Sequence, residues 1–264
     1  MTVTVRLLAW WLGHVACGMA LFVQSARAAP ELYFVTEPFP PFTYAEQDQA
    51  AGPMVAVLRA VCAEIKRSCR IEVMPWRRAL AIAQRGEADG IFTVVDTPER
   101  RVYFHVSAPV LEARYTLFSR AGDDFRLTGD RQGLRGRSIA AYGPSATVLA
   151  LDELIEGVPN VSTTVEPDNV TVLRKLAAGR YGPGGLALVN EAVALHLIRT
   201  ENLAGLQAAG PVKHFSYAFG LSRQRVSVEQ ARAFDRALVR LCRSGRTADL
   251  VKPYEVPASA CGRG

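Results

Sequence analysis

From residue 32 onward, short apolar runs alternate with longer amphipathic segments, and this alternation restricts the fold more than any other feature. Strands are expected at 32–35, 70–74, 90–95, 138–142, 161–165, 186–189 and 215–221. Helices are expected at 54–65, 77–85, 148–155, 170–178, 192–198 and about 228–242, with a further helix start at Thr97. The alternation favours an α/β fold with a mostly parallel sheet. It falls into two similar blocks that meet near Arg120, which indicates two lobes with a cleft between them.

The first 28 residues have the pattern of an export signal. Arg6 precedes a mostly apolar run over residues 7–23, and Ala26-Arg27-Ala28 forms a small-x-small cleavage site. Two glycines and a histidine interrupt the run, so it fits a bilayer span of about 20 residues less well. A membrane anchor and a lipoprotein linked at Cys17 are the alternatives. We expect cleavage after Ala28 and a periplasmic mature protein.

The charge distribution gives no sign of a nucleic-acid partner. The 264-residue chain has 31 Lys and Arg against 25 Asp and Glu, a net charge of +6. Removal of the leader takes away Arg6 and Arg27 and leaves 29 − 25 = +4. The basic residues are scattered, without interleaved aromatic residues or zinc-finger spacing. A solvated surface explains them, and we expect no nucleic-acid binding and no cofactor.

Four cysteines remain after cleavage: Cys62, Cys69, Cys242 and Cys261. An even number in an exported chain indicates disulfides, although three pairings are open. Local spacing favours Cys62–Cys69 and Cys242–Cys261, because each pair closes a short loop. Zinc binding is the rival interpretation. It is not expected, because there is no CxxC motif and the histidines form no spaced cluster with the cysteines.

Several residues are candidates for a small-ligand site, and each also has a purely structural interpretation. Arg100 lies in the first turn of a helix after a buried strand, where a guanidinium beside helix N–H groups can receive a carboxylate; a surface arginine is the alternative. Ser145 and Thr147 either donate to an anion or only cap a helix. Phe39, Phe42, Tyr44 and Trp76 follow strands. These aromatic side chains either wall a ligand slot or cap the core.

The usual motifs of nucleophilic catalysis and phosphate binding are missing from the sequence. There is no GxSxG, and no histidine stands near a candidate serine or cysteine. The glycine-rich run 182–185 lacks the Gly-Lys-Ser/Thr ending of a phosphate loop and precedes a strand. The residues therefore give little support for nucleophilic catalysis and none for a phosphate loop, and we expect no catalytic residues.

The order of several short motifs resembles the periplasmic solute-binding proteins of polar amino acid ABC transporters, the family of the histidine and lysine-arginine-ornithine binding proteins. The matching segments are Pro40-Pro41-Phe42-Thr43-Tyr44, Pro75-Trp76 with Leu80, Gly86-Glu87-Ala88-Asp89-Gly90-Ile91, Thr97-Pro98-Glu99-Arg100, Leu134-Arg135-Gly136-Arg137 and Ala177-Ala178-Gly179-Arg180. Cys62 and Cys69 also match the spacing of a disulfide seen in some members. Each motif is weak alone, but together they span almost the whole mature chain.

The resemblance implies a type II periplasmic binding protein fold, with two Rossmann-like lobes joined by a two-strand hinge. Lobe 1 is expected over 29–114 plus 216–264, and lobe 2 over 115–215. The residues that the resemblance assigns to ligand binding are Arg100 for the carboxylate, Thr93 and Val95 at a strand end, Phe39, Phe42 and Trp76 around the ligand, and Ser145 and Asn190 from lobe 2. The resemblance implies a monomer that captures an amino acid or another small carboxylate. It would present this ligand to an ABC permease or a membrane sensor.

Two features depart from the family pattern. One is the glycine-rich insertion at 182–185, which lengthens a loop, and the other is residue 190. Asn190 stands where the family has an ammonium-binding aspartate, and an amide oxygen supplies no charge. Glu37, Asp96 or Glu191 could supply the missing anion, or the ligand could be a different small carboxylate. Cyclohexadienyl dehydratases are enzymatic relatives of this scaffold, so a dehydratase of the cyclohexadienyl or arogenate type remains an alternative. Val193 aligns with the catalytic glutamate of such enzymes, and Glu191 lies two residues away.

Overall fold

The computed structural model describes residues 30–261; the expected leader, residues 1–28, lies outside them. One large mixed sheet has the strand order β4–β1–β5–β11–β7–β10–β8–β9, with β6 paired to β11 and a separate β2–β3 hairpin. The strands are β1 (Leu32–Thr36), β2 (Tyr44–Glu46), β3 (Gln49–Ala51), β4 (Cys69–Val73), β5 (Gly90–Val95), β6 (Phe104–Val106), β7 (Leu111–Arg120), β8 (Ser138–Tyr142), β9 (Ser162–Glu166), β10 (Leu186–Asn190) and β11 (Leu206–Ser222). The helices are α1 (Pro53–Glu64), α2 (Trp76–Gln84), α3 (Pro98–Tyr103), α4 (Ala146–Ile155), α5 (Asn169–Ala177), α6 (Glu191–Thr200), α7 (Val228–Arg243) and α8 (Arg246–Val251), with short 3₁₀ turns at Arg131–Leu134 and Lys252–Tyr254.

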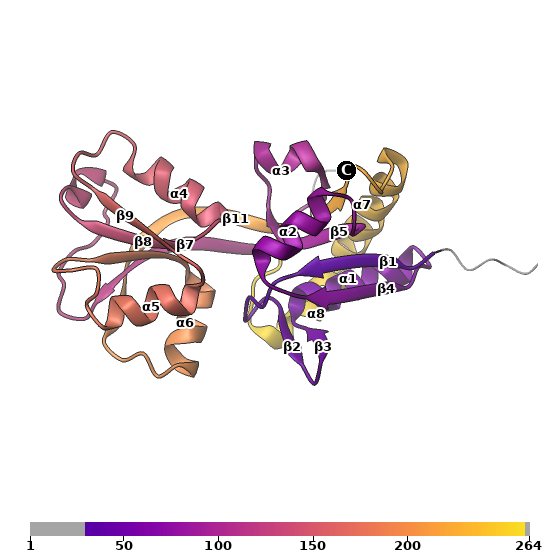
Figure 1. Ribbon diagram of the computed structural model, residues 1–264. Coiled ribbons are helices and arrows are strands. Elements are labelled where there is room, and N and C mark those ends of the chain that lie inside the picture. The colour runs from indigo at the N-terminus through magenta and orange to yellow at the C-terminus, as the bar shows by residue number, and fades with distance from the viewer. Residues whose placement is uncertain (1–29, 262–264) are drawn as a thin grey trace, which may run out of the picture.

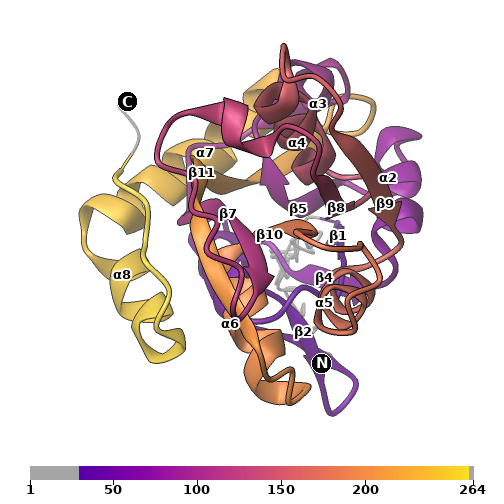
Figure 2. The same cartoon turned by 90° about the vertical axis from the view of Figure 1, so that its left-hand side faces the viewer.

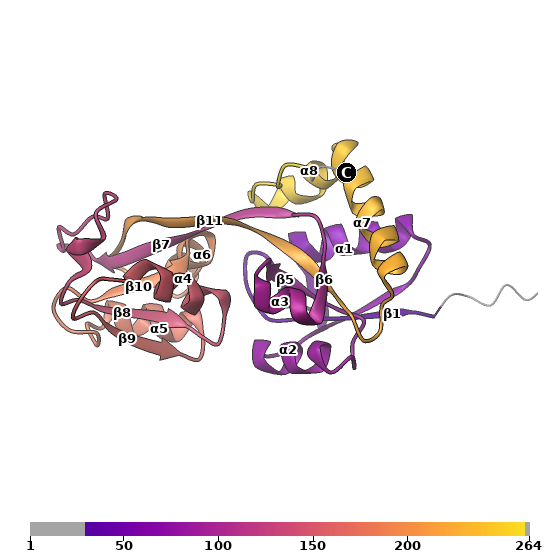
Figure 3. The ribbon, with the colours of Figure 1, turned by 90° about the horizontal axis from the view of Figure 1, so that it is seen from above.

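The elements gather into two halves, which are joined by the long strands β7 and β11 (Figure 1). The half built on β1, β4 and β5 carries α1, α2, α3, α7 and α8 and is called lobe 1 below. The half built on β8, β9 and β10 carries α4, α5 and α6 and is called lobe 2. Seen from above, β7 and β11 run side by side from one half to the other (Figure 3). The expected α/β fold of the type II periplasmic binding protein class is confirmed.

The residue limits given above for the two lobes stay a prediction, and the strand pairing agrees with them. Residues 115–118 of β7 pair with β10 of lobe 2. Residues 217–221 of β11 pair with β5 of lobe 1. Between these points β7 and β11 pair mainly with each other, at positions such as Arg114 opposite His214. A hinge at this place leaves both lobe sheets intact.

Lobe 1 is held by an aromatic core between its sheet and α7. Phe34 of β1 and Phe219 of β11 pack on Phe234 of α7, with ring centroids 6.0 and 5.5 Å apart. All three rings are buried, and burial of one such side chain contributes about 1.5–3 kcal/mol. A capping box between Ser227 and Gln230 fixes the start of α7. The arginines of α7 face outward, as the amphipathic pattern predicts.

Both predicted disulfides are present. Cys62–Cys69 links α1 to β4 with a Cα–Cα distance of 6.2 Å. Cys242–Cys261 links the end of α7 to the C-terminal segment, with a Cα–Cα distance of 5.5 Å. No helix within residues 30–261 is long and apolar enough to span a bilayer.

Several strands and one helix differ from the sequence-based prediction or are absent from it. The predicted strand 215–221 is in fact the last part of β11, which begins at Leu206. Gly210 and Pro211 interrupt its apolar pattern, and the register with β7 shifts near both residues, so the alternation that marks a strand is lost there. β7 and the short elements β2, β3, β6 and α8 were also not expected, because the short ones fall below the length at which a period is visible.

Candidate ligand-binding site between the two lobes

The lobe 1 wall of the cleft is made by the ends of two parallel strands. β1 ends at Thr36 and is followed by Glu37 and Phe39, while β5 ends at Val95 and leads into α3. The Thr97 side chain caps α3 by accepting from the backbone N–H of Arg100 at 3.3 Å. Because the carboxyl ends of parallel strands meet at one edge of the sheet, these segments converge at the cleft.

Thr93 gives this wall an unusual backbone. Its φ is +64°, which a β-branched residue rarely adopts. The register between β5 and β11 shifts at this point, between Ala218 and Phe219, so Thr93 is the extra residue of a β-bulge. Its hydroxyl lies 3.1 Å from that of Thr43, and both residues are buried. The bulge redirects the end of β5 toward the cleft.

The lobe 2 wall is made by the end of β8 and the start of α4. Gly143 follows Tyr142, and a Cβ there would lie 2.7 Å from both Val148 and Val165, so only glycine fits this turn. Ser145 then caps α4: its Oγ accepts from the backbone N–H of Thr147 at 3.1 Å and donates to the Tyr142 carbonyl at 2.7 Å. The first residues of α4, Ala146 and Thr147, line the space between the lobes together with Ser145.

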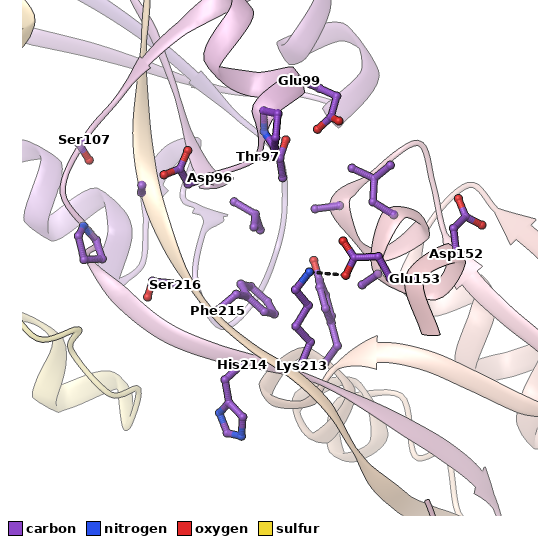
Figure 4. A pocket seen from close by; sticks show the side chains of 18 residues that line it. Asp96, Thr97, Glu99, Ser107, Asp152, Glu153, Lys213, His214, Phe215 and Ser216 are labelled. Carbon is purple, nitrogen blue, oxygen red and sulfur yellow. Dashed lines mark hydrogen bonds and ion pairs between the residues drawn. The ribbon is translucent and has the colours of Figure 1, made fainter. Parts of the chain in front are cut away.

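A central cavity lies between the two walls and brings most of the predicted residues together. It is lined by Glu37, Phe39, Trp76, Thr93, Val95, Arg100, Tyr115, Tyr142, Ser145, Ala146, Thr147 and Tyr217. Larger hollows adjoin it on either side. The one between α3, α4 and β11 measures about 750 Å³ (Figure 4). The other, between Pro38–Pro40 and the α5 and α6 side of lobe 2, measures about 570 Å³.

Arg100 is the cation of the central cavity. Its Cζ lies 5.3 Å from the centre of the Trp76 ring. Within residues 30–261 its guanidinium has no hydrogen-bond or ion-pair partner. Burial lowers the pKa of Arg100, while the carboxyl groups of Glu99 and Glu37 raise it, and an arginine stays charged under any ordinary condition. A partly buried guanidinium without a partner is a receptor for an anion.

Comparison with known proteins identifies the family to which this two-lobed chain belongs. The sequence matches the family described as bacterial extracellular solute-binding proteins, family 3, over residues 32–256. The chain is a family 3 solute-binding protein. No curated protein gives a significant match.

Solved structures share the fold of this solute-binding protein at low sequence identity. A histidine kinase sensor domain with similarity to periplasmic binding proteins has a TM-score of 0.76 at 18% identity, over 88% of this chain and 99% of that one. An ancestral arginine-binding protein bound to arginine has a TM-score of 0.74 at 18% identity, over 86% and 99%. AbpA from Streptococcus pneumoniae, an amino acid ABC transporter substrate-binding protein bound to L-arginine, has a TM-score of 0.70 at 24% identity, over 85% and 94%.

Glu37 is the carboxyl group of the central cavity. Its Oε2 accepts from the Tyr142 hydroxyl at 2.7 Å. Away from β7 and β11, this is the one side-chain hydrogen bond that joins the lobes within the described residues. Burial raises the pKa of Glu37 to about 7, and the Tyr142 hydroxyl and Arg100 lower it in part. Near neutral pH this carboxyl group is therefore a mixture of its charged and neutral forms.

The other two acidic residues considered from the sequence are engaged elsewhere. Asp96 forms an exposed ion pair with Arg101. Glu191 pairs with Arg114 and accepts from the Thr116 hydroxyl at 2.6 Å. Neither lines the central cavity. Of the three candidates, only Glu37 does.

Two of the predicted ligand residues lie behind the cavity wall. Asn190 caps α6 by accepting from the Val193 N–H at 3.2 Å, and its Nδ2 donates to the Tyr217 hydroxyl at 3.0 Å. Phe42 is buried against Phe39 and Tyr217, with ring centroids 5.9 and 5.0 Å away. Both therefore support residues that line the cavity and do not line it themselves.

Three tyrosines that line the cavity were not predicted from the sequence: Tyr115, Tyr142 and Tyr217. Tyr142 had a usable signal, because it is the last residue of a predicted strand, where α/β proteins place their ligands. The other two lie in β7 and β11, whose extent the apolar pattern does not show.

Proposed function

We propose that this protein captures a small carboxylate-bearing solute between its lobes in the periplasm and presents it to an ABC permease. The observation that carries the proposal is the Arg100 guanidinium, which lines the cavity and has no partner within residues 30–261. An arginine offers two parallel N–H donors that match the two oxygens of a carboxylate. Export by the leader 1–28 and the extracellular character of the family support the periplasmic location.

The two walls supply complementary parts of the receptor. Lobe 1 contributes the Arg100 side chain, and lobe 2 contributes the start of α4 at Ser145 and Ala146. A helix N-terminus favours an anion through its unpaired N–H groups and its dipole. A carboxylate held by both therefore ties lobe 1 to lobe 2.

The size of the cavity requires the lobes to move. The space around Arg100 between the two larger hollows measures about 30 Å³, room for only about two water molecules. A solute of amino-acid size enters only when the walls separate, and the paired strands β7 and β11 provide the hinge. Because the solute contacts both walls, it stabilises the closed form, and the membrane partner distinguishes closed from open.

A membrane sensor is the second possible recipient of the solute. The similarity to a histidine kinase sensor domain favours this recipient, whereas AbpA is named as part of a transporter. Ligand capture by Arg100 is the same for both.

The position of Glu191 supports a binding protein over a dehydratase. The side-chain hydrogen bond from Arg114 lowers the pKa of Glu191, and Thr116 and the Arg114 charge lower it further. A general acid needs the opposite, a carboxyl group that keeps its proton near the working pH. Val193, at the aligned position, has no acidic group at all.

Thermal unfolding of the purified protein against a panel of amino acids, dicarboxylates, keto acids, opines and prephenate tests the proposal. A solute at 100 times its Kd adds about 2.7 kcal/mol to the free energy of unfolding, which raises Tm by several degrees. We expect a hit that stays chemically intact and is lost in Arg100→Ala. A hit that is converted to product supports the dehydratase instead, and the absence of any hit among carboxylates contradicts the proposal.

A further inference from the structure

Besides Arg100 and the start of α4, two side chains that line the cavity have a donor without an acceptor among the described residues. Trp76 lines the cavity and is 7% exposed, and its buried Nε1–H has no acceptor within residues 30–261. The Tyr217 hydroxyl accepts from Asn190 Nδ2, so its own proton is available to another acceptor. Both groups are best satisfied by an oxygen of the ligand, because an unpaired buried donor costs free energy.

Acceptors for an ammonium are scarce in the same cavity. The Asn190 side chain uses its oxygen on the Val193 N–H and its nitrogen on Tyr217. Val95 has no hydroxyl, and the Thr93 hydroxyl is shared with Thr43. Glu37 is the one carboxyl group that lines the cavity, and it already accepts from Tyr142. An ammonium would therefore meet one partly neutral carboxyl group and, among the described residues that line the cavity, no second one.

We infer that this site takes an oxygen-rich carboxylate without an ammonium group, such as a hydroxy, oxo or dicarboxylic acid, and discriminates against α-amino acids. The inference rests on the proposed function, since it assumes that Arg100 holds one carboxylate. The second polar group of the ligand is then a hydrogen-bond acceptor, which receives the protons of Trp76 Nε1 and the Tyr217 hydroxyl.

The charges around Glu37 make the two ligand classes distinguishable. Arg100 faces it from α3, Tyr142 from β8, Tyr115 from β7 and Tyr217 from β11. The adjoining hollow, which Glu37 also lines, contains Asp168, His196 and Glu201. Burial has already raised the pKa of Glu37 to about 7. A ligand with negative charge and no ammonium raises that pKa further, so the protein takes up protons, whereas an ammonium lowers it and protons are released.

Matched ligand pairs give the first test. Glutamate, 2-hydroxyglutarate and 2-oxoglutarate differ only at the α-substituent, as do aspartate, malate and oxaloacetate, and alanine, lactate and pyruvate. We expect the hydroxy or oxo member of at least one set to bind at least about tenfold more tightly than the amino member, by titration calorimetry. Equal or tighter binding of the amino members overturns the inference and leaves the proposed function standing. If neither these members nor any other carboxylate of the panel binds, the proposed function fails and the inference with it, whereas a panel hit that carries an ammonium overturns the inference alone.

Proton exchange on binding gives a second test, independent of which matched set binds. Calorimetry at pH 7 in phosphate and in Tris, whose heats of ionisation differ, counts the protons that accompany binding. Uptake that disappears in Glu37→Gln and persists in His196→Gln is the expected result. Release of protons by the tightest ligand overturns the inference.

Trp76→Phe tests the donor directly. The phenyl ring keeps the apolar wall and removes the N–H group. We expect Kd for the oxygen-rich ligand to rise about 2- to 10-fold, the worth of one hydrogen bond, with an unchanged Kd for the amino member of the same set. An equal rise for both members shows that Trp76 acts only by packing and contradicts its role as a donor.

Discussion

Two arginines near the cleft have opposite surroundings. Arg114, on β7 at the hinge, is paired with Glu191, which also accepts from the Thr116 hydroxyl. Arg100, in the central cavity, has no such partner within residues 30–261. Charges that serve the fold are paired by the fold itself, whereas a charge that serves a ligand is left to be paired by that ligand. The difference separates the hinge from the binding site without any reference to sequence similarity.

The largest expected effect comes from Arg100→Ala. Loss of one partner of a buried charge pair costs about 2–5 kcal/mol, so ligand affinity falls by about two to three orders of magnitude. The free energy of unfolding without ligand stays constant or rises, because the substitution removes a partly buried charge that has no partner. Titration calorimetry and urea unfolding measure the two quantities.

Arg101→Ala is the matched control for this substitution. Arg101 is the next residue and lies on the surface, and among residues 30–261 its side chain pairs with Asp96 alone. Its removal should leave Kd unchanged. If both variants lose affinity equally, the effect belongs to the helix α3 as a whole and the comparison between paired and unpaired arginines fails.

The next effect is a pH dependence of stability that Glu37 causes. The pKa of Glu37 is about 7 in the folded protein, against an ordinary 4.5. Between these two pH values the folded protein keeps a proton on Glu37 that the unfolded chain has already lost. The stabilisation is therefore complete below pH 4.5 and is lost as the pH rises through 7, by at most about 3 kcal/mol. Urea unfolding between pH 4 and 8 should show this decline in the wild type and a flatter profile in Glu37→Gln.

Glu191 should respond to pH in the opposite direction. Its pKa is lowered by Arg114 and Thr116, so its contribution is present above pH 4.5 and is lost as the pH falls. Because the Arg114 side chain is 47% exposed, solvent weakens the pair, and Glu191→Gln should cost only about 1 kcal/mol of unfolding free energy. Ligand affinity should change by less than about threefold. A large loss of affinity would place Glu191 in the binding machinery and remove the distinction between the two arginines.

The sequence could predict the lobe 1 wall better than the lobe 2 wall. Thr93 lies within a strongly apolar run, and Phe39 and Arg100 follow such runs closely, so their positions are predictable from the local pattern. Tyr142 and Glu37 are 105 residues apart in the chain, and no local pattern reveals that they meet. Glu37 was accordingly one of three candidate anions, and only the fold selects among them.

The hinge was the hardest part of the fold to predict. β11 is 17 residues long and crosses between the lobes, so its environment changes along its length. Its buried residues follow one another near the C-terminal end, while the first part is mostly half-buried, with exposed residues at intervals. Figure 2 shows β7 and β11 beside each other at one flank of lobe 2. There β7 is buried over residues 115–119, whereas most of the first part of β11 is only partly covered. A strand of this kind has no single period, and the sequence indicated only its buried end.

The smallest expected effect concerns the strained end of β5. Thr93→Gly removes the hydroxyl contact to Thr43 but relieves a positive φ that disfavours threonine, so the two effects, each about 1 kcal/mol, largely cancel. Thr43→Val removes the same contact with no change in backbone and should cost the full amount, about 1 kcal/mol. Urea unfolding of the two variants side by side separates the strain from the hydrogen bond. Because Thr93 lines the cavity and Thr43 does not, only Thr93→Gly should also weaken ligand binding, through the loosened bulge. Equal destabilisation by both variants would show that the positive φ of Thr93 stores no strain. The conformation of the bulge would then be set by the packing around it.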